Sequence, residues 1–290
     1  MRWAPRSSAG EGKPAQTLFL NSNPSKGACE TGTGMLGGIK PYIYPVVYRY
    51  SADMAPMGQN PATIYTMCSH YQGIKERERY LRHFGVEPPS ESGKPDLWPT
   101  YMGTFIRHHP QADVGDEAVP ATEAVSGMFG LVPHWATDTK IARQTFNSPS
   151  ETASAKPSFR DAWKRSQLCI IPAQAIYEPD WRSGKAVATR IERADGEPMG
   201  IAGLWSWWKS PKGEVLHSYS MLTINAEHHA LMQQFHKPAD EKRMVVILPT
   251  ESYRPWLDAS PANVMDYLQP FTADLLVATP APREAKAVNS

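Results

Sequence analysis

A succession of short β-prone runs, separated by turn signals, constrains the fold more than any other feature of this sequence. The runs are YMGTFIRH, SGMFGLVPHWA, LCIIPA, AIYE, KAVATRIER, GIAGLWSWW, VLHSYSMLTI and RMVVILP. Turn signals at residues 194–197 (ADGE) and 211–214 (PKGE) predict hairpins between neighbouring runs. The pattern predicts an α+β fold with a mainly antiparallel, barrel-like β-sheet core and flanking helices.

Few segments have helical periodicity. Ile74, Leu81 and Phe84 form one apolar stripe in QGIKERERYLRHFG, and Gly85 is placed to end that helix. We expect two further helices at NAEHHALMQQF and TESYRPWL, with Asn225 and Thr250 as their N-caps.

Local amino-acid composition divides the chain into three parts. Residues 1–66 contain 15 Gly and Pro, and most of this segment is loop-like. We therefore expect residues 1–66 to be a disordered or mis-annotated N-terminal extension, residues 67–275 to form the folded domain, and residues 276–290 to form a flexible tail.

Composition excludes several classes of protein. The sequence has no apolar run of the roughly 18 residues that cross a bilayer, and no apolar stretch typical of a secretory signal follows the first arginines. Three widely spaced cysteines, Cys29, Cys68 and Cys169, form neither a disulfide framework nor a metal-binding pattern. We expect a cytoplasmic protein without a membrane partner, a metal or an organic cofactor.

The charge balance limits how the domain could bind nucleic acid. Six of the 30 basic and three of the 29 acidic residues lie in residues 1–66, which leaves 24 basic and 26 acidic residues in 67–290. Because counterion release drives non-specific binding to DNA, such a domain would need a local basic patch. One candidate patch contains Lys140, Arg143, Lys156, Arg160, Lys164 and Arg165, although composition alone favours a solvated charged face.

Four polar residues stand out as candidates for catalysis: Cys68 in TMCSHYQG, Asn147 in FNSPSET, Glu178 in AIYEPDW and His236 in FHKPADEKR. Glu178 follows an apolar run that would place its carboxylate on a rigid strand, and His236 follows the expected helix at 225–235. Each has a structural alternative: a buried thiol, a turn residue, a surface carboxylate and a packing histidine. No single residue decides between the alternatives.

The order of the motifs is more specific than any one of them. Met67-Cys68, GLVPHWA, N-SPS-ET, KPSFRDAW, CIIPAQAIYEP, AGLWSWW, MLTINAE and RMVVILP occur colinearly between residues 67 and 250. In this arrangement the sequence resembles the SRAP family, the SOS response-associated peptidases regarded as abasic-site processing proteins.

The resemblance implies a reaction and a role for each candidate. Proteins of this family form a covalent crosslink with the open-chain aldehyde of an abasic site in single-stranded DNA. An N-terminal cysteine, here Cys68, would supply both an amine and a thiol, which close a thiazolidine ring on the aldehyde carbon. Glu178 would act as acid and base, His236 would protonate the deoxyribose oxygen, and Asn147 would orient the abasic nucleotide. Residues for binding DNA would be Trp98, Pro99, Trp135, Arg143, Arg160, Thr223 and Arg243.

Three departures from the family pattern affect the expected DNA contacts. Ser148-Pro149 replaces the usual Ala-Arg, so a phosphate-binding arginine is missing. Cys68-Ser69-His70 replaces the common Cys-Gly-Arg, and six residues, KPADEK, separate His236 from Arg243.

Three functions are compatible with these residues. The first is a monomeric covalent sensor of abasic sites, which would associate with the nucleoid when bound to DNA. The second is a thiol peptidase, acting on its own leader or on other peptides, with Cys68 as nucleophile and His236 as base. The third is a non-covalent single-stranded DNA-binding module, expected if Cys68 stays internal.

Overall fold

A computed structural model describes residues 68–90, 94–112 and 119–281. The expected extension over residues 1–66 lies outside the described residues. No helix in the described part of the chain is long and apolar enough to cross a membrane.

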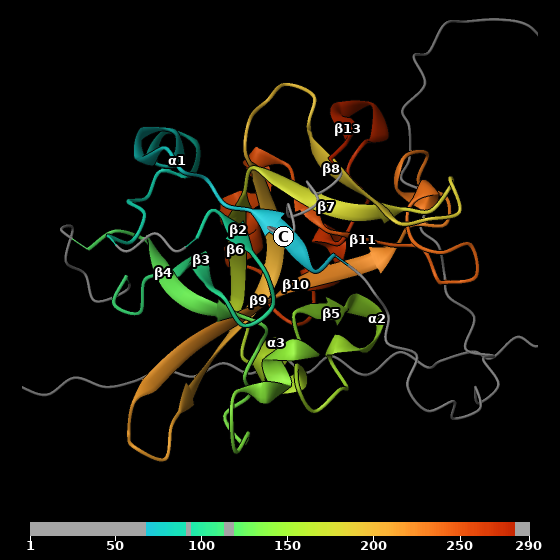
Figure 1. The fold of residues 1–290 in the computed structure, drawn as a ribbon. Helices are drawn as coiled ribbons and strands as arrows, with labels where there is room; N and C mark the ends of the chain where they lie inside the picture. Colours follow the sequence, from blue (N-terminus) through green and yellow to red (C-terminus); the bar gives the residue numbers. More distant parts are fainter. Residues whose placement is uncertain (1–67, 91–93, 113–118, 282–290) are drawn as a thin grey trace, which may run out of the picture. The chain divides into compact units, whose positions relative to one another are not determined.

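Five strands of the described chain close into a β-barrel. They are β3 (Met102–His108), β4 (Thr122–Phe129), β6 (Leu168–Ala173), β9 (Met199–Lys209) and β10 (Val215–Asn225). Pairing follows the order β10–β4–β3–β6–β9, and β9 also pairs with β10, which completes the ring (Figure 1). Within the ring the pairing of β4 with β10 is parallel, and the other pairings are antiparallel. The predicted barrel-like, mainly antiparallel core is therefore confirmed.

Three further strands extend the barrel sheet. They are β5 (Asn147–Pro149) and β11 (Arg243–Val245), which pair with β10, and β12 (Ile247–Leu248), which pairs with β9. The β9–β10 hairpin turns at residues 211–214, as predicted, with Lys209 opposite Val215. In Figure 1 this hairpin projects beyond the rest of the barrel.

A second sheet packs beside the barrel and contains the first described strand. Its order is β13 (Leu276–Pro280), β8 (Val187–Arg193), β7 (Ala175–Asp180), β1 (His70–Gln72) and β2 (Asp96–Leu97). All its pairings are antiparallel. The two sheets share one apolar core, in which Tyr71 of β1 lies against Phe129 of β4, and its hydroxyl is hydrogen-bonded to that of Tyr219 in β10.

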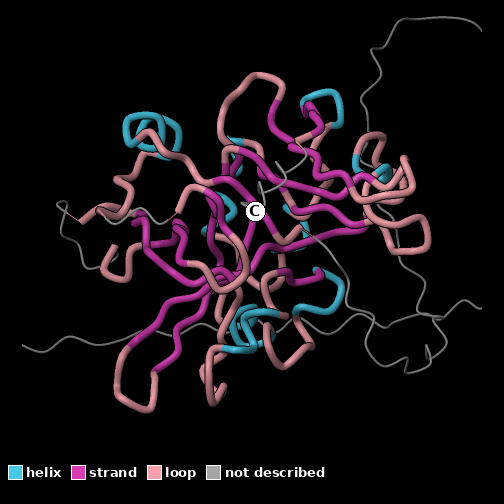
Figure 2. Tube along the Cα trace, viewed as in Figure 1, coloured by secondary structure: helices cyan, strands magenta, loops and turns pink. Residues whose placement is uncertain are grey.

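Helices in the described chain are short and lie outside the sheets, as Figure 2 shows. The α-helices are α1 (Arg77–Phe84), α2 (Ser150–Ala153), α3 (Arg160–Lys164) and α4 (Tyr253–Leu257). The 3-10 helices are η1 (Lys140–Arg143), η2 (Met232–Gln234), η3 (Thr250–Ser252), η4 (Val264–Tyr267) and η5 (Ala273–Leu275). Helix α1 ends as predicted at Gly85, whose left-handed backbone lets its N–H bond to Leu81. At TESYRPWL, η3 leads directly into α4, but the N-cap positions are Pro249 and Ser252, so the predicted N-cap Thr250 is instead the first residue of η3.

The helix predicted at residues 225–235 is wrong. Strand β10 continues to Asn225, which pairs with Arg243, so Asn225 ends a strand instead of beginning a helix. Turns follow, and only Met232–Gln234 is helical, as η2. Pairing with β11 gives hydrogen-bond partners to backbone groups of this segment, whereas the first N–H groups of a helix have no partner within the helix.

Two other predictions need correction. The turn at residues 194–197 forms, with Gly196 donating to the carbonyl of Arg193, but it is not a hairpin. It leads from β8 in the second sheet to β9 in the barrel. Residues 276–280, predicted to belong to a flexible tail, form β13 and pair with β8 over residues 189–193. The alternating pattern of Leu276 and Ala278 packs against the core and favours a strand there.

Candidate active site around Cys68

Cys68 lies at the entrance to β1, with its side chain buried between the two sheets. Its thiol donates a weak hydrogen bond to the carbonyl of His70 at 3.6 Å. Burial, and then the nearby carboxyl of Glu178, raise the pKa of the Cys68 thiol well above its ordinary value. The thiol is therefore protonated at neutral pH in this environment.

Asn147 reaches Cys68 from β5. The sequence suggested a polar loop here, but Asn147–Pro149 is a strand that pairs in parallel with β10, opposite Met221 at Asn147. The Asn147 Nδ2 group donates to the carbonyl oxygen of Cys68 at 3.1 Å. Its Oδ1 atom is buried and has no hydrogen-bond partner among the described residues.

Glu178 approaches the same point from β7, the neighbour of β1. Residue 177 pairs with His70, so Glu178 lies one position along and turns its side chain to the core side. The carboxyl is 2% exposed, and burial raises its pKa from 4.5 to about 7, although His236 and the Cys68 thiol both act to lower it. Its Oε2 atom has no hydrogen-bond partner in the described chain. A carboxyl with this pKa exchanges protons readily at neutral pH.

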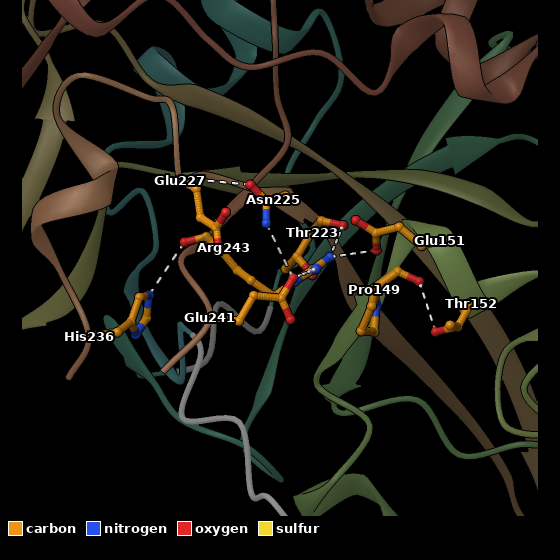
Figure 3. Close-up of polar contacts among 9 residues, drawn as sticks. All are labelled: Pro149, Glu151, Thr152, Thr223, Asn225, Glu227, His236, Glu241 and Arg243. Atoms are coloured by element: carbon orange, nitrogen blue, oxygen red, sulfur yellow. Dashed lines mark hydrogen bonds and ion pairs between the residues drawn. The ribbon is translucent and has the colours of Figure 1, made fainter. Parts of the chain in front are cut away.

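His236 completes the buried group. Its Nε2 atom lies 3.5 Å from Oε2 of Glu178 and 3.4 Å from the carbonyl oxygen of Arg243, the contact drawn in Figure 3. The backbone N–H of His236 donates to the carbonyl of Pro179 at 3.0 Å, which ties the residue to β7. His236 has a φ of 64°, in the left-handed region that non-glycine residues seldom adopt. Such outliers cluster at functional sites.

Arg243, whose carbonyl contacts the His236 ring, is buried, and so is Thr223, which contacts Arg243. Figure 3 shows the guanidinium of Arg243 between two carboxylates, Glu151 and Glu241, each at 2.7 Å. The same guanidinium donates to the hydroxyl and the carbonyl of Thr223 at 3.3 and 2.9 Å. Contact with a DNA phosphate would require at least one carboxylate to move, so the predicted phosphate contacts of Arg243 and Thr223 stay predictions.

His70 takes part in an aromatic stack beside Cys68. Its ring lies between those of Trp98, at 4.1 Å between centroids, and Tyr177, at 4.0 Å. Asp96 accepts from Nε2 of His70 at 3.0 Å. Trp98 and Pro99 are half-buried. The stack joins Trp98, a predicted base-stacking residue, to the strands that carry Cys68 and Glu178.

The remaining predicted DNA-binding residues are exposed. Trp135 is 47% exposed, and its indole N–H lies 3.4 Å from the carbonyl of Pro157. Arg143 ends η1, and Arg160 begins α3 beside Asp161, which also approaches His134. The other four cations of the basic patch, Lys140, Lys156, Lys164 and Arg165, are exposed as well.

The structure thus brings Cys68, Asn147, Glu178 and His236 together from four segments that are distant in the sequence. Three partners were missed: Tyr177 and Asp96 around His70, and Glu241 at Arg243. Tyr177 adjoins a residue already singled out, whereas nothing in the sequence indicated Asp96 or Glu241. In the described part of the chain no group of three His, Cys, Asp or Glu side chains could hold a metal ion.

Comparison with known proteins gives relatives whose names state a role, and two of them illustrate the range. Abasic site processing protein YoqW of Bacillus subtilis is 35% identical over 150 residues, which are 50% of this chain and 63% of that protein. Abasic site processing protein HMCES of Gallus gallus is 26% identical over 210 residues, 64% of this chain and 59% of that protein. The chain therefore spans less than two thirds of the length of these relatives.

Solved structures match over a larger share. A crystal structure of a Bordetella bronchiseptica protein is 47% identical, with a TM-score of 0.68, and covers 74% of this chain and 100% of its own. A Bacteroides thetaiotaomicron protein, 20% identical with a TM-score of 0.61, covers 73% of this chain and 90% of its own and shows the fold alone.

The family model described as SOS response associated peptidase matches residues 67–289, which include every strand of both sheets and all four members of the buried group. The resemblance seen in the motifs is confirmed, and the chain belongs to the SOS response associated peptidase (SRAP) family.

Proposed function

We propose that this protein senses abasic sites in single-stranded DNA by forming a covalent crosslink through Cys68. The observation that carries the proposal is the buried group around Cys68, in which Asn147 binds its carbonyl and Glu178, with a pKa of about 7, lies against His236. Family membership and the names of the relatives YoqW and HMCES support the choice of substrate.

The proposed reaction needs a free amine at Cys68. The amine attacks the aldehyde carbon of the opened deoxyribose, and the carbinolamine loses one water to give an imine. The thiol then adds to the imine carbon, and its proton passes to the nitrogen, which closes a five-membered thiazolidine ring. The product contains all atoms of both reactants except one water. A peptide nitrogen at Cys68 would be too weakly nucleophilic, so the active form begins with Cys68.

The surroundings of Cys68 suit each proton transfer. Glu178 would accept a proton from the attacking amine and return it to the departing hydroxyl, because a pKa of about 7 makes both steps accessible at neutral pH. The thiol stays protonated until the imine has formed, since burial raises its pKa. His236 would protonate the ring oxygen of the sugar as the ring opens.

Two buried oxygens further support an amine at Cys68. Asn147 Oδ1 makes no hydrogen bond among the described residues, and Glu178 Oε2 has only the long contact with His236 Nε2 at 3.5 Å. Burying an acceptor without a donor is unfavourable by about 1–3 kcal/mol. An α-amine or ammonium at Cys68 would supply up to three N–H donors near these two side chains.

A chain that begins at Cys68 tests the proposal directly. Incubated with a single-stranded oligonucleotide that carries one abasic site, it should give a denaturation-resistant adduct whose intact mass is the sum of the reactants less one water. Cys68→Ala should give no adduct. Cys169→Ala, which removes the other buried free cysteine of the described chain, should react like the wild type.

The full 290-residue chain, shown by its intact mass to retain residues 1–67, should give no adduct. An adduct from that chain, or none from the chain that begins at Cys68, would refute the proposal. Steady cleavage of peptides, lost in His236→Ala, would instead favour a thiol peptidase. The raised pKa of the Cys68 thiol disfavours that function, because a cysteine peptidase needs a thiolate.

A further inference from the structure

We propose that His229 is a positioning residue that fixes the segment carrying His236 against Glu178. His229 lies seven residues before His236, between the end of β10 and η2. Its effect on crosslinking rests on the proposed function, whereas its effect on the geometry of His236 does not.

His229 uses both ring nitrogens inside the protein. The side chain is 8% exposed. Its Nε2 atom lies 2.7 Å from the carbonyl oxygen of Phe271, in the loop before η5. Its Nδ1 atom accepts from the backbone N–H groups of Leu231 at 3.2 Å and Met232 at 2.9 Å.

These partners determine the tautomer of His229. A carbonyl oxygen only accepts, so Nε2 must carry the proton, and two N–H donors require a bare lone pair on Nδ1. His229 is thus a neutral imidazole that closes the turn into η2 on one side and binds the Phe271 loop on the other. The neighbouring histidine, His228, is exposed to solvent, whereas His229 is buried.

The turn that His229 closes leads directly to His236. After Met232, the chain continues through η2 to Phe235, which forms a β-bridge with Asp180 just beyond Glu178. His236 follows with its left-handed backbone and its N–H on Pro179. The ring contacts of His236, at 3.4 and 3.5 Å, are long, so the backbone path must place the ring. His229 is the side chain that fixes the start of this path.

Two substitutions separate the two functions of the ring. Asn carries its amide oxygen where His carries Nδ1, so His229→Asn keeps an acceptor for Leu231 and Met232 and loses the bond to Phe271. Gln carries its amide nitrogen near the place of Nε2, so His229→Gln keeps the donor to Phe271 and loses the acceptor in the turn. His228→Asn is the matched control on the adjacent exposed histidine.

The variants are compared by the crosslinking rate of chains that begin at Cys68, from pH 5 to 9. We expect His229→Gln to react roughly 10- to 100-fold more slowly, the scale of loss from a misplacement of about 1 Å. We expect His229→Asn and His228→Asn to stay within about twofold of the wild type. A displaced His236 would no longer lower the pKa of Glu178, so the pH profile of the Gln variant alone should move to higher pH.

Thermal unfolding is measured on the same samples, since both His229 substitutions remove a buried hydrogen bond. Equal losses of rate in the two His229 variants, following their losses of thermal stability and with an unchanged pH profile, would overturn the proposal.

Nuclear magnetic resonance keeps the test independent of crosslinking. In protein labelled with ¹⁵N-histidine, His229 should show one protonated nitrogen at Nε2 and one bare nitrogen at Nδ1. The His236 signals should shift in His229→Gln and stay in place in His229→Asn. If the wild type forms no adduct, the proposed function is refuted. If the His236 signals stay in place in both His229 variants, the positioning role of His229 is refuted independently.

Discussion

At the scale of single residues, Glu178 is a carboxyl group enclosed in the protein core. It lies in β7 with its side chain enclosed, and burial outweighs the influence of His236 and of the Cys68 thiol on its pKa. Burial of a carboxylate costs free energy that is avoided when the group is protonated. Such a cost suits a proton-transferring residue, because active sites commonly retain groups that weaken the fold.

This cost can be measured through the pH dependence of stability. The folded protein binds the Glu178 proton up to about pH 7, whereas an unfolded glutamate releases it near 4.5. The contribution of Glu178 to stability is therefore present below pH 4.5 and is lost as the pH rises through 7. Between pH 5 and pH 8, the free energy of unfolding of Glu178→Gln should rise relative to the wild type by about 2–3 kcal/mol.

Denaturant unfolding of both proteins at the two pH values gives this difference directly. Glu192→Gln, on the neighbouring strand β8 and half-buried, is the control and should show little change. A constant difference between wild type and Glu178→Gln at both pH values would mean that the carboxyl is not raised in pKa.

At the scale of elements, the exit from β4 depends on a single glycine. Gly130 has a φ of 113°, and its N–H donates to the carbonyl of Tyr219 in β10. A Cβ atom at this position would lie 2.1 Å from the carbonyl oxygen of Ala142 in η1. The three nearest atoms all belong to the backbone of Ala142, so no flexible side chain can move aside to make room. The glycine therefore lets β4 end against η1, the helix that carries Arg143.

Gly130→Ala should lower the free energy of unfolding by at least about 3 kcal/mol, from backbone strain and overpacking together. Gly73→Ala is the matched control. Its Cβ would meet Leu97 at 3.4 Å, an ordinary contact, and its backbone is not left-handed. We expect the control to stay within about 1 kcal/mol of the wild type by denaturant unfolding. Similar losses in both variants would show that Gly130 is not special.

Some of the secondary-structure elements could be predicted from the sequence, and others could not. Strand β6 coincides with the run LCIIPA, because a fully buried strand is continuously apolar. The segment at 225–235 has helical periodicity, but His229 accepts the N–H of Met232 with its own ring, which an α-helix would give to a carbonyl. The turn at 194–197 is a local structure and was predictable. That it connects strands of two different sheets depends on long-range strand pairing, which was not predictable.

In the candidate site, too, local features could be predicted from the sequence and long-range contacts could not. Cys68, Asn147, Glu178 and His236 were identified from motifs, and each lies at a strand or next to one. The distances between these residues and their burial depend on how the barrel and the second sheet pack together. No local sequence pattern encodes that packing. The contact of Glu241 with Arg243 was missed for that reason.

At the scale of the whole molecule, the distribution of charge matters more than its sum. Residues 67–290 carry 24 basic and 26 acidic residues, so bulk attraction to DNA is weak. Arg243 is engaged by Glu151 and Glu241, and Pro149 provides no cation. For the proposed binding of a single strand, we therefore expect the exposed basic patch around η1 and α3 to supply the phosphate contacts.

Salt dependence of binding tests this role of the patch, measured with chains that carry Cys68→Ala and begin at residue 68. Removing one cation that binds a phosphate should reduce the slope of log affinity against log salt concentration by about 0.7 for a single strand. Adding Arg143→Ala and Arg160→Ala should therefore reduce the slope by about 1.4. Adding Arg77→Ala and Arg254→Ala removes the same charge from α1 and α4, where both arginines pair with carboxylates, and should leave the slope unchanged. Equal reductions in the two double variants would mean that DNA responds to the total charge of the domain and not to the patch.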